Sequence, residues 1–230
     1  MRRTVFLLAA LSSLTALAAS QSPQDKIAQF RQMLAENQQK RKMFTWLETT
    51  QVAYQGTIKM TKVSDCQFMG PAPKPICTEL SLQQAALPGG FIRRRVAEEK
   101  QAELKAYMDS VRALVATYVP LQPPLIDKAY QSGNVAFSPD PETGVSRIVI
   151  SNYQQPGDRI TITYSPATRQ IKRVQLATWL NTPSAVVTAD VTFATLPNGV
   201  FYAYQKVLNA EAKQVTVTVT STDFAEMIEQ

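Results

Sequence analysis

The feature that most constrains the fold is a run of alternating segments between residues 145 and 224. Within residues 214–220, a valine at every second position alternates with a polar residue, which is the period-two pattern of a half-buried β-strand. Six such segments follow one another: VSRIVISNY, DRITITYS, RQIKRVQLATWL, AVVTADVTFATL, VFYAYQKVL and QVTVTVTST. The links between them are short and carry turn residues such as Pro156-Gly157, so antiparallel hairpins are expected. We interpret the run as one curved meander, with a β-sandwich as the alternative.

One segment of the run breaks its own alternation. Ile171 is out of phase with Val174 and Leu176. One extra residue in a strand shifts the phase in this way and bends the strand. The sequence therefore predicts a β-bulge near Lys172 and Arg173.

Two amphipathic helices are expected to cover this sheet. The first spans residues 23–42, with Pro23 at its start and Ile27, Phe30, Met33 and Leu34 at helical spacing. The second spans residues 97–119 and carries a longer apolar stripe: Leu104, Tyr107, Met108, Val111, Leu114, Val115 and Tyr118. The stripe is explained by packing against the sheet, or alternatively by forming the wall of an apolar cavity.

The expected domain organisation is a signal peptide over residues 1–20 and a single α+β domain over residues 21–230. Within the domain we predict helix 23–42, strands within 43–80, helix 97–119 and an antiparallel meander over 134–224. Two strands are expected in the first of these strand regions, separated near Gln55-Gly56. The fold class is thus a curved antiparallel β-meander, an incomplete barrel, covered by two amphipathic helices.

The amino terminus has the pattern of a secretory signal. Arg2 and Arg3 precede a short apolar run that ends in small residues. No cysteine lies near the expected cut, so no lipid anchor is predicted, and no later segment is apolar enough for a transmembrane anchor in the mature chain. The formal net charge of +6, less the two signal arginines, leaves +4, which does not indicate a nucleic-acid partner. We expect an exported protein, periplasmic or extracellular.

The chain contains two cysteines, Cys66 and Cys77. Two cysteines in an exported protein usually pair, so a structural disulfide is predicted. A redox pair and a metal site are the alternatives. A redox pair more often has Cys-x-x-Cys spacing, and two thiols without histidine make a poor metal site.

The absence of histidine from the sequence removes several catalytic chemistries. Serine and cysteine triads, the H-E-x-x-H zinc motif and histidine acid–base catalysis all need that side chain. No P-loop and no G-x-G-x-x-G motif occurs either, so no cofactor, no metal and no catalytic residue is predicted. A pair of carboxylates is the remaining option for an enzyme. The candidates are Glu48, Asp65, Asp109, Asp158, Asp190 and Asp223.

Two of these acids have an ordinary structural explanation. Asp190 lies within a strand and shares its polar face with Thr188 and Thr192, which indicates a solvated position. Asp158 follows Pro156-Gly157 and is explained as a turn residue.

Two basic clusters are candidates for an anionic partner such as lipid head groups. They consist of Lys40, Arg41, Lys42, Arg93, Arg94 and Arg95. Cations near a helix N-terminus oppose the helix dipole, so the second cluster is unfavourable if the helix has already begun there. An ordinary solvated linker is the alternative.

The order of helix, strands, long helix and meander, after a signal peptide, resembles the periplasmic lipoprotein-carrier fold of the LolA and LolB type. The segments NYQQPGDRITITYS and VVTADVTFATLPNGVFYAY also resemble a group of exported bacterial proteins. The resemblance implies a curved half-barrel with helices over its concave face and an apolar cavity for acyl chains.

Three functions from different classes remain. The first is a non-catalytic envelope protein that binds a lipid, an acyl chain or another apolar ligand between sheet and helices, with a lipid or lipoprotein as partner. Its predicted lining consists of Ile160, Ile162, Val174, Leu176, Val187, Val191 and Phe193, facing Tyr107, Val111 and Leu114. The second is a structural protein with a solid core that binds an envelope protein through an edge strand at residues 214–220. The third is a carboxylate-dependent hydrolase.

Overall fold

The structure, a computed structural model, describes residues 23–69, 74–86, 90–119, 121–140 and 142–227. The helices are α1 (Pro23–Arg41), α2 (Phe91–Ala116), α3 (Pro123–Gln131) and the short 3-10 helix η1 (Glu211–Lys213). The strands are β1 (Phe44–Tyr54), β2 (Thr57–Gln67), β3 (Ile76–Gln84), β4 (Val135–Asp140), β5 (Val145–Ser151), β6 (Arg159–Ser165), β7 (Gln170–Trp179), β8 (Val186–Thr195), β9 (Phe201–Ala210) and β10 (Val215–Glu226).

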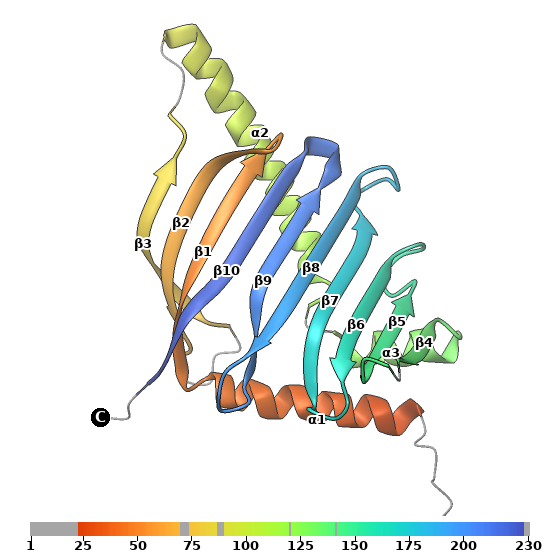
Figure 1. Cartoon of the computed structure of the whole chain (residues 1–230). Helices are drawn as coiled ribbons and strands as arrows, with labels where there is room; N and C mark the ends of the chain where they lie inside the picture. The colour runs from red at the N-terminus through yellow and green to blue at the C-terminus, as the bar shows by residue number, and fades with distance from the viewer. Residues whose placement is uncertain (1–22, 70–73, 87–89, 120, 141, 228–230) are drawn as a thin grey trace, which may run out of the picture.

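All ten strands form one sheet in the order β3-β2-β1-β10-β9-β8-β7-β6-β5-β4 (Figure 1). Every neighbouring pair is antiparallel. Two meanders, β1 to β3 and β4 to β10, therefore join where β1 pairs with β10. The predicted α+β class with an antiparallel, unclosed sheet is confirmed, and the β-sandwich alternative is wrong because these strands share a single sheet.

The structure adds one strand and confirms the bulge. Strand β3 lies beyond the two amino-terminal strands that we expected, whereas α3 lies where residues 125–131 predict a short helical turn that ends at Gly133. The register between β6 and β7 shifts where Thr163 pairs with Arg173 and Tyr164 pairs with Ile171, which leaves Lys172 as the extra residue.

Two predicted positions are wrong. Residues 214–220 are not an edge, because β10 pairs with β1 on one side and β9 on the other. The edges of the sheet are β3 and β4. Helix α2 begins at Phe91 rather than near residue 97, and ion pairs from Arg94 to Glu98 and from Arg95 to Glu99 span its first turns. Such i,i+4 pairs stabilise helices, which helps to explain the earlier start.

The helices lie on one side of the sheet, with α2 crossing it diagonally and α1 running along the strand ends (Figure 1). One buried cluster joins α1, α3 and the end of α2 to β5, β6 and β7; its members include Met33, Tyr118, Ile126, Ile148, Ile160 and Ile162. A second cluster lies under the middle of α2 and contains Met108, Val111, Val187, Ala210 and Val215. A third contains Trp46, Cys66 and Phe68.

Among the described helices, none is long and apolar enough to cross a bilayer. The amino-terminal residues assigned to the signal peptide lie outside the described residues. The side chains of Ile27 and Phe30 in α1 also lie outside that description.

Candidate ligand-binding face of the sheet

The side chains that face the helices form rows across the strands, because directly paired residues of antiparallel strands share a face. The row nearest the middle of α2 contains Val187, Ala210, Val215 and Tyr54. The first three of these residues are at most 1% exposed. This part of the face is sealed by α2.

A second row on the same face is not sealed, and we call it the open row. Its members, from β7 to β3, are Val174, Val191, Lys206, Val219, Thr50, Lys62 and Leu82. The first six are half-buried and Leu82 is exposed. Val191 and Val219 belong to none of the three buried clusters formed by the described residues. The open row therefore presents apolar and cationic side chains on the helix-bearing side of the sheet.

The ten predicted lining residues divide between these environments. Ile160, Ile162, Leu176, Val187 and Val111 are buried in the first two clusters. Val174, Val191, Phe193, Tyr107 and Leu114 are half-buried. The structure thus brings all ten to the helix-bearing side, but only the second five leave side-chain surface accessible without moving a helix.

Tyr107 and Val111 pack with Val187, one of the sheet residues that they were predicted to face. They belong to the cluster over β8, β9 and β10, whereas Ile160 and Ile162 are covered by α1, α3 and the end of α2. The hydroxyl of Tyr107 is buried and has no hydrogen-bond partner within the described part of the chain. Burial raises the pKa of Tyr107.

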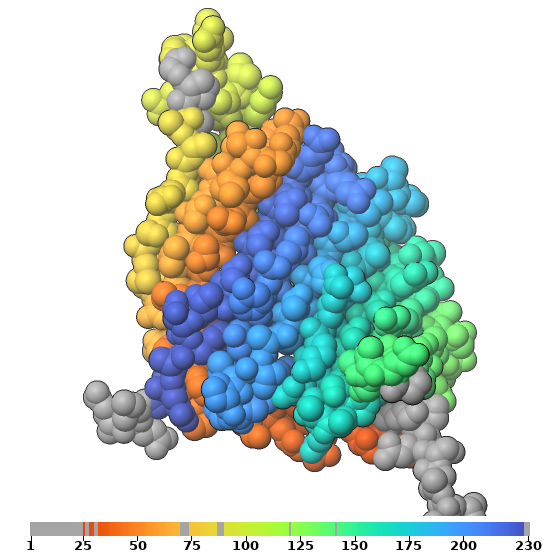
Figure 2. Space-filling model, viewed as in Figure 1, coloured from red at the N-terminus to blue at the C-terminus, as the bar shows by residue number. Residues whose placement is uncertain are grey.

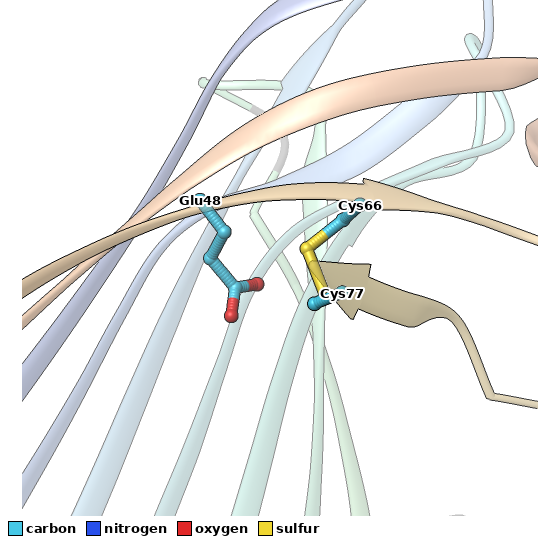
Figure 3. Close-up of side chains that lie close together, drawn as sticks. All are labelled: Glu48, Cys66 and Cys77. Atoms are coloured by element: carbon cyan, nitrogen blue, oxygen red, sulfur yellow. A yellow bond between two sulfur atoms is a disulfide. The ribbon is translucent and has the colours of Figure 1, made fainter. Parts of the chain in front are cut away.

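An ion pair connects the open row to the disulfide region. Lys206 Nζ donates a hydrogen bond to Glu48 Oε2 at 2.8 Å. The Glu48 carboxylate points toward the disulfide between Cys66 on β2 and Cys77 on β3 (Figure 3). The S–S distance is 2.07 Å, which confirms the predicted disulfide.

Glu48, Cys66 and Cys77 lie close enough together to be considered as metal ligands, since their potential ligand atoms lie within 4.8 Å of one another. The two sulfur atoms are bonded to each other and offer no thiolate, and Glu48 already accepts the Lys206 ammonium. This donor set does not fit a metal ion.

The predicted anionic-partner patch is divided between two places. Lys40, Arg41 and Lys42 lie at the end of α1, and Arg93, Arg94 and Arg95 lie at the start of α2, at opposite ends of the molecule in Figure 1. The guanidinium of Arg41 lies 5.5 Å from the Trp46 ring centre and 5.4 Å from that of Phe68. Burial lowers the pKa of Arg41, although Glu48 opposes this effect. The two clusters therefore do not form one continuous patch.

The acids weighed as catalytic candidates lie in separate environments. Asp190 forms an ion pair with Arg173 on the polar face away from the helices, with Arg173 Nε 2.8 Å from Asp190 Oδ1. This hydrogen bond, with the nearby Arg173 charge, lowers the pKa of Asp190. Asp158 is 1% exposed and accepts hydrogen bonds from the backbone N–H groups of Tyr153, Gln154 and Gln155. Asp158 is thus held inside its turn, as the turn interpretation expects.

Sequence reasoning missed the polar members of the open row: Lys206, Thr50 and Lys62. These residues share one row because β1 pairs with both β10 and β2. The pairing of β1 with β10 joins segments that are far apart in the sequence. No local pattern identifies such a partner. The start of α2 was missed as well, although Gly90 and the two Arg–Glu spacings were available as signals.

No protein-family model matches this chain, and no curated protein matches it in sequence. A crystal structure of a DUF1329 family protein from Desulfovibrio piger is similar over 89% of this chain and 94% of its own, with a TM-score of 0.41 and 7% sequence identity. A likeness at this level is too weak to transfer a residue role or a ligand to this chain.

Proposed function

We propose that this chain is an exported, non-catalytic envelope protein that binds a lipid, an acyl chain or another apolar ligand along the open row, between the sheet and its helices. The observation that supports this function most directly is the exposure of the row. Val191 and Val219 are only half-buried on the side of the sheet that carries the helices. The free energy falls when an apolar ligand covers exposed apolar surface beside a core.

The charges on the row favour a ligand with an acidic end. Lys206 is paired with Glu48, whereas Lys62 has no ion pair among the residues that the structure describes. A carboxylate or phosphate at one end of an apolar chain would meet Lys62 while the chain lies along the valines. Export is supported by the disulfide, which persists in oxidising compartments.

The test is extraction of the purified chain from residue 21 onward, followed by lipid mass spectrometry. We expect co-purified lipid or fatty acid in the unmodified protein and its loss in Val191→Asp, which places a carboxylate on the open row. Thr192→Asp is the matched control, because Thr192 is exposed and lies on the opposite face of the same strand. Ligand-free protein that also fails to bind a fluorescent fatty acid overturns the proposal.

A further inference from the structure

The first turns of α2 expose more apolar surface than a soluble helix end needs. Phe91 is 82% exposed, Ile92 is 76% exposed and Val96 is 45% exposed. At 100° per residue these three side chains fall within an arc of about 140° on the helix. We call residues 91–96 the α2 tip. Its apolar side chains lie on one side of the helix, in an arc that also contains Arg95, and belong to none of the three buried clusters of the described residues.

The same six residues are strongly basic. Arg93, Arg94 and Arg95 follow Ile92 directly, and the first turn contains no acidic residue. Arg94 and Arg95 pair with Glu98 and Glu99, both as exposed contacts that solvent screens. Arg93 has no ion pair in the described part of the chain. The tip therefore combines apolar side chains with cationic side chains that are weakly neutralised.

The tip also stands clear of the rest of the molecule. Figure 2 shows the beginning of α2, in yellow-green, projecting beyond the sheet, while the sealed row lies under the middle of the helix. A projecting end of this kind can contact a flat surface without a clash between that surface and the sheet.

We propose that the α2 tip docks on a lipid bilayer surface that carries anionic head groups. Phe91, Ile92 and Val96 enter the boundary between head groups and acyl chains, and the arginines lie at the level of the phosphates. Apolar side chains at this boundary and basic side chains near the phosphates are the two features that bind amphipathic helices to anionic membranes. A protein partner fits less well, because three side chains on a projecting helix end supply much less than the roughly 800 Å² per partner of a stable protein interface.

This inference does not depend on the open row. Vesicle binding by the tip and ligand retention by the sheet are measured separately, so either one can fail while the other holds. Tip variants should leave the co-purified ligand unchanged, and Val191→Asp should leave vesicle binding unchanged.

The test is co-sedimentation of the chain from residue 21 onward with vesicles of phosphatidylcholine, alone or mixed with phosphatidylglycerol. We expect preferential binding to the anionic vesicles and weaker binding as salt is added. The double variant Phe91→Ser/Ile92→Ser should weaken binding by about ten-fold or more, and Arg93→Gln by about five-fold. Val119→Ser is the control, because Val119 is a 65% exposed apolar residue beyond the other end of α2.

Three results of the vesicle experiment overturn the proposal: no vesicle binding, binding that is unchanged in the double variant, or equal weakening by Val119→Ser. Sedimentation without vesicles tests whether the α2 tip binds a second copy of the chain instead of a membrane. A dimer that dissociates in the double variant assigns the tip to self-association and overturns the membrane assignment. Circular dichroism of each variant checks that these exposed positions leave the fold intact.

Discussion

At the scale of single residues, Asp158 organises one end of the sheet. Its buried carboxylate accepts three backbone N–H groups of the turn after β5. The Tyr118 hydroxyl donates to Asp158 Oδ2 at 2.8 Å and lies 2.8 Å from Thr178 Oγ1. Because Tyr118 follows α2, this network holds the end of that helix against the turn and against β7. A buried polar group of this kind stabilises the fold only while all its partners are satisfied.

The substitution Asp158→Asn tests this role. The amide nitrogen that this substitution introduces cannot accept the hydrogen bonds that one carboxylate oxygen of Asp158 accepts, so N–H or O–H donors lose their partner. We therefore expect the free energy of unfolding to fall by about 3 kcal/mol. Urea denaturation measures the change. Asp190→Asn is the matched control and should lose less than about 1 kcal/mol, since Asp190 forms a surface ion pair on the polar face. Equal losses in both variants would contradict the assigned role.

Tyr118 predicts a dependence of stability on alkaline pH. Burial raises its pKa above the ordinary value near 10, and the Asp158 charge and hydrogen bond act in the same direction. Above about pH 10 the unfolded chain therefore loses this proton while the folded chain keeps it, so stability falls as pH rises. Each such group contributes a slope of about 1.4 kcal/mol per pH unit.

Urea denaturation between pH 9 and pH 12 measures this slope in the unmodified chain and in Tyr118→Phe. We expect the variant to be less stable at neutral pH but to lose stability less steeply with rising pH, by about one proton. Tyr107 and Tyr153, whose pKa values are also raised by burial, keep their share of the slope in both proteins. Parallel profiles would show that Tyr118 does not carry the effect.

At the scale of elements, β3 is the least supported strand of the sheet. Among the described strands it pairs with β2 alone, and all nine of its residues are exposed. The disulfide joins it to β2 where Cys66 and Cys77 are paired directly across the two strands. Because so little of β3 is buried, the disulfide supplies much of the stability of its pairing with β2.

Reduction of the disulfide should release β3 without unfolding the molecule. Hydrogen exchange should show loss of amide protection in β3, while β6 and β7 stay protected under the buried cluster that they share. The global free energy of unfolding should fall by about 2–3 kcal/mol in the chain-entropy model. Strand β4, the opposite edge, serves as the internal control and should not change.

At the scale of the whole molecule, β10 is the strand that joins the two meanders. It pairs with β1 from Phe44 opposite Glu226 to Tyr54 opposite Val215, and with β9 on its other side. The open row crosses this junction through Val219, flanked by Thr50 and Lys206. The candidate site is therefore a product of the complete sheet and of neither meander alone.

Thr218→Pro should separate the two meanders. Proline removes a backbone donor in the middle of a central strand, which we expect to destabilise the fold by about 3 kcal/mol or more. Thr218→Ala removes the side chain and keeps the backbone donor, so it should remain folded. Circular dichroism and urea denaturation compare the two variants, and a stable Thr218→Pro protein contradicts the central position of β10.

Local patterns predicted much of this architecture. Alternation in residues 145–224 identified strands β5 to β10, and the phase slip at Ile171 identified the bulge. The export pattern led to the disulfide. The order of strands was not predictable, because the pairing of β1 with β10 is decided by packing between distant parts of the chain. For the same reason the sequence indicated the valines of the open row but not Thr50 or Lys62 beside them.

The pairing of Tyr54 with Val215 has a consequence for the order of events during synthesis. Strands β1, β2 and β3 emerge early, yet among the described strands their partner in the larger meander is β10, the last of these strands to emerge. A three-stranded unit with an unpaired β1 must wait, with its apolar face uncovered, until β10 arrives. Such waiting intermediates expose the surfaces by which chains aggregate. We therefore expect the segment from β1 to β3 to bind chaperones in the compartment where the protein folds, until β10 pairs with β1.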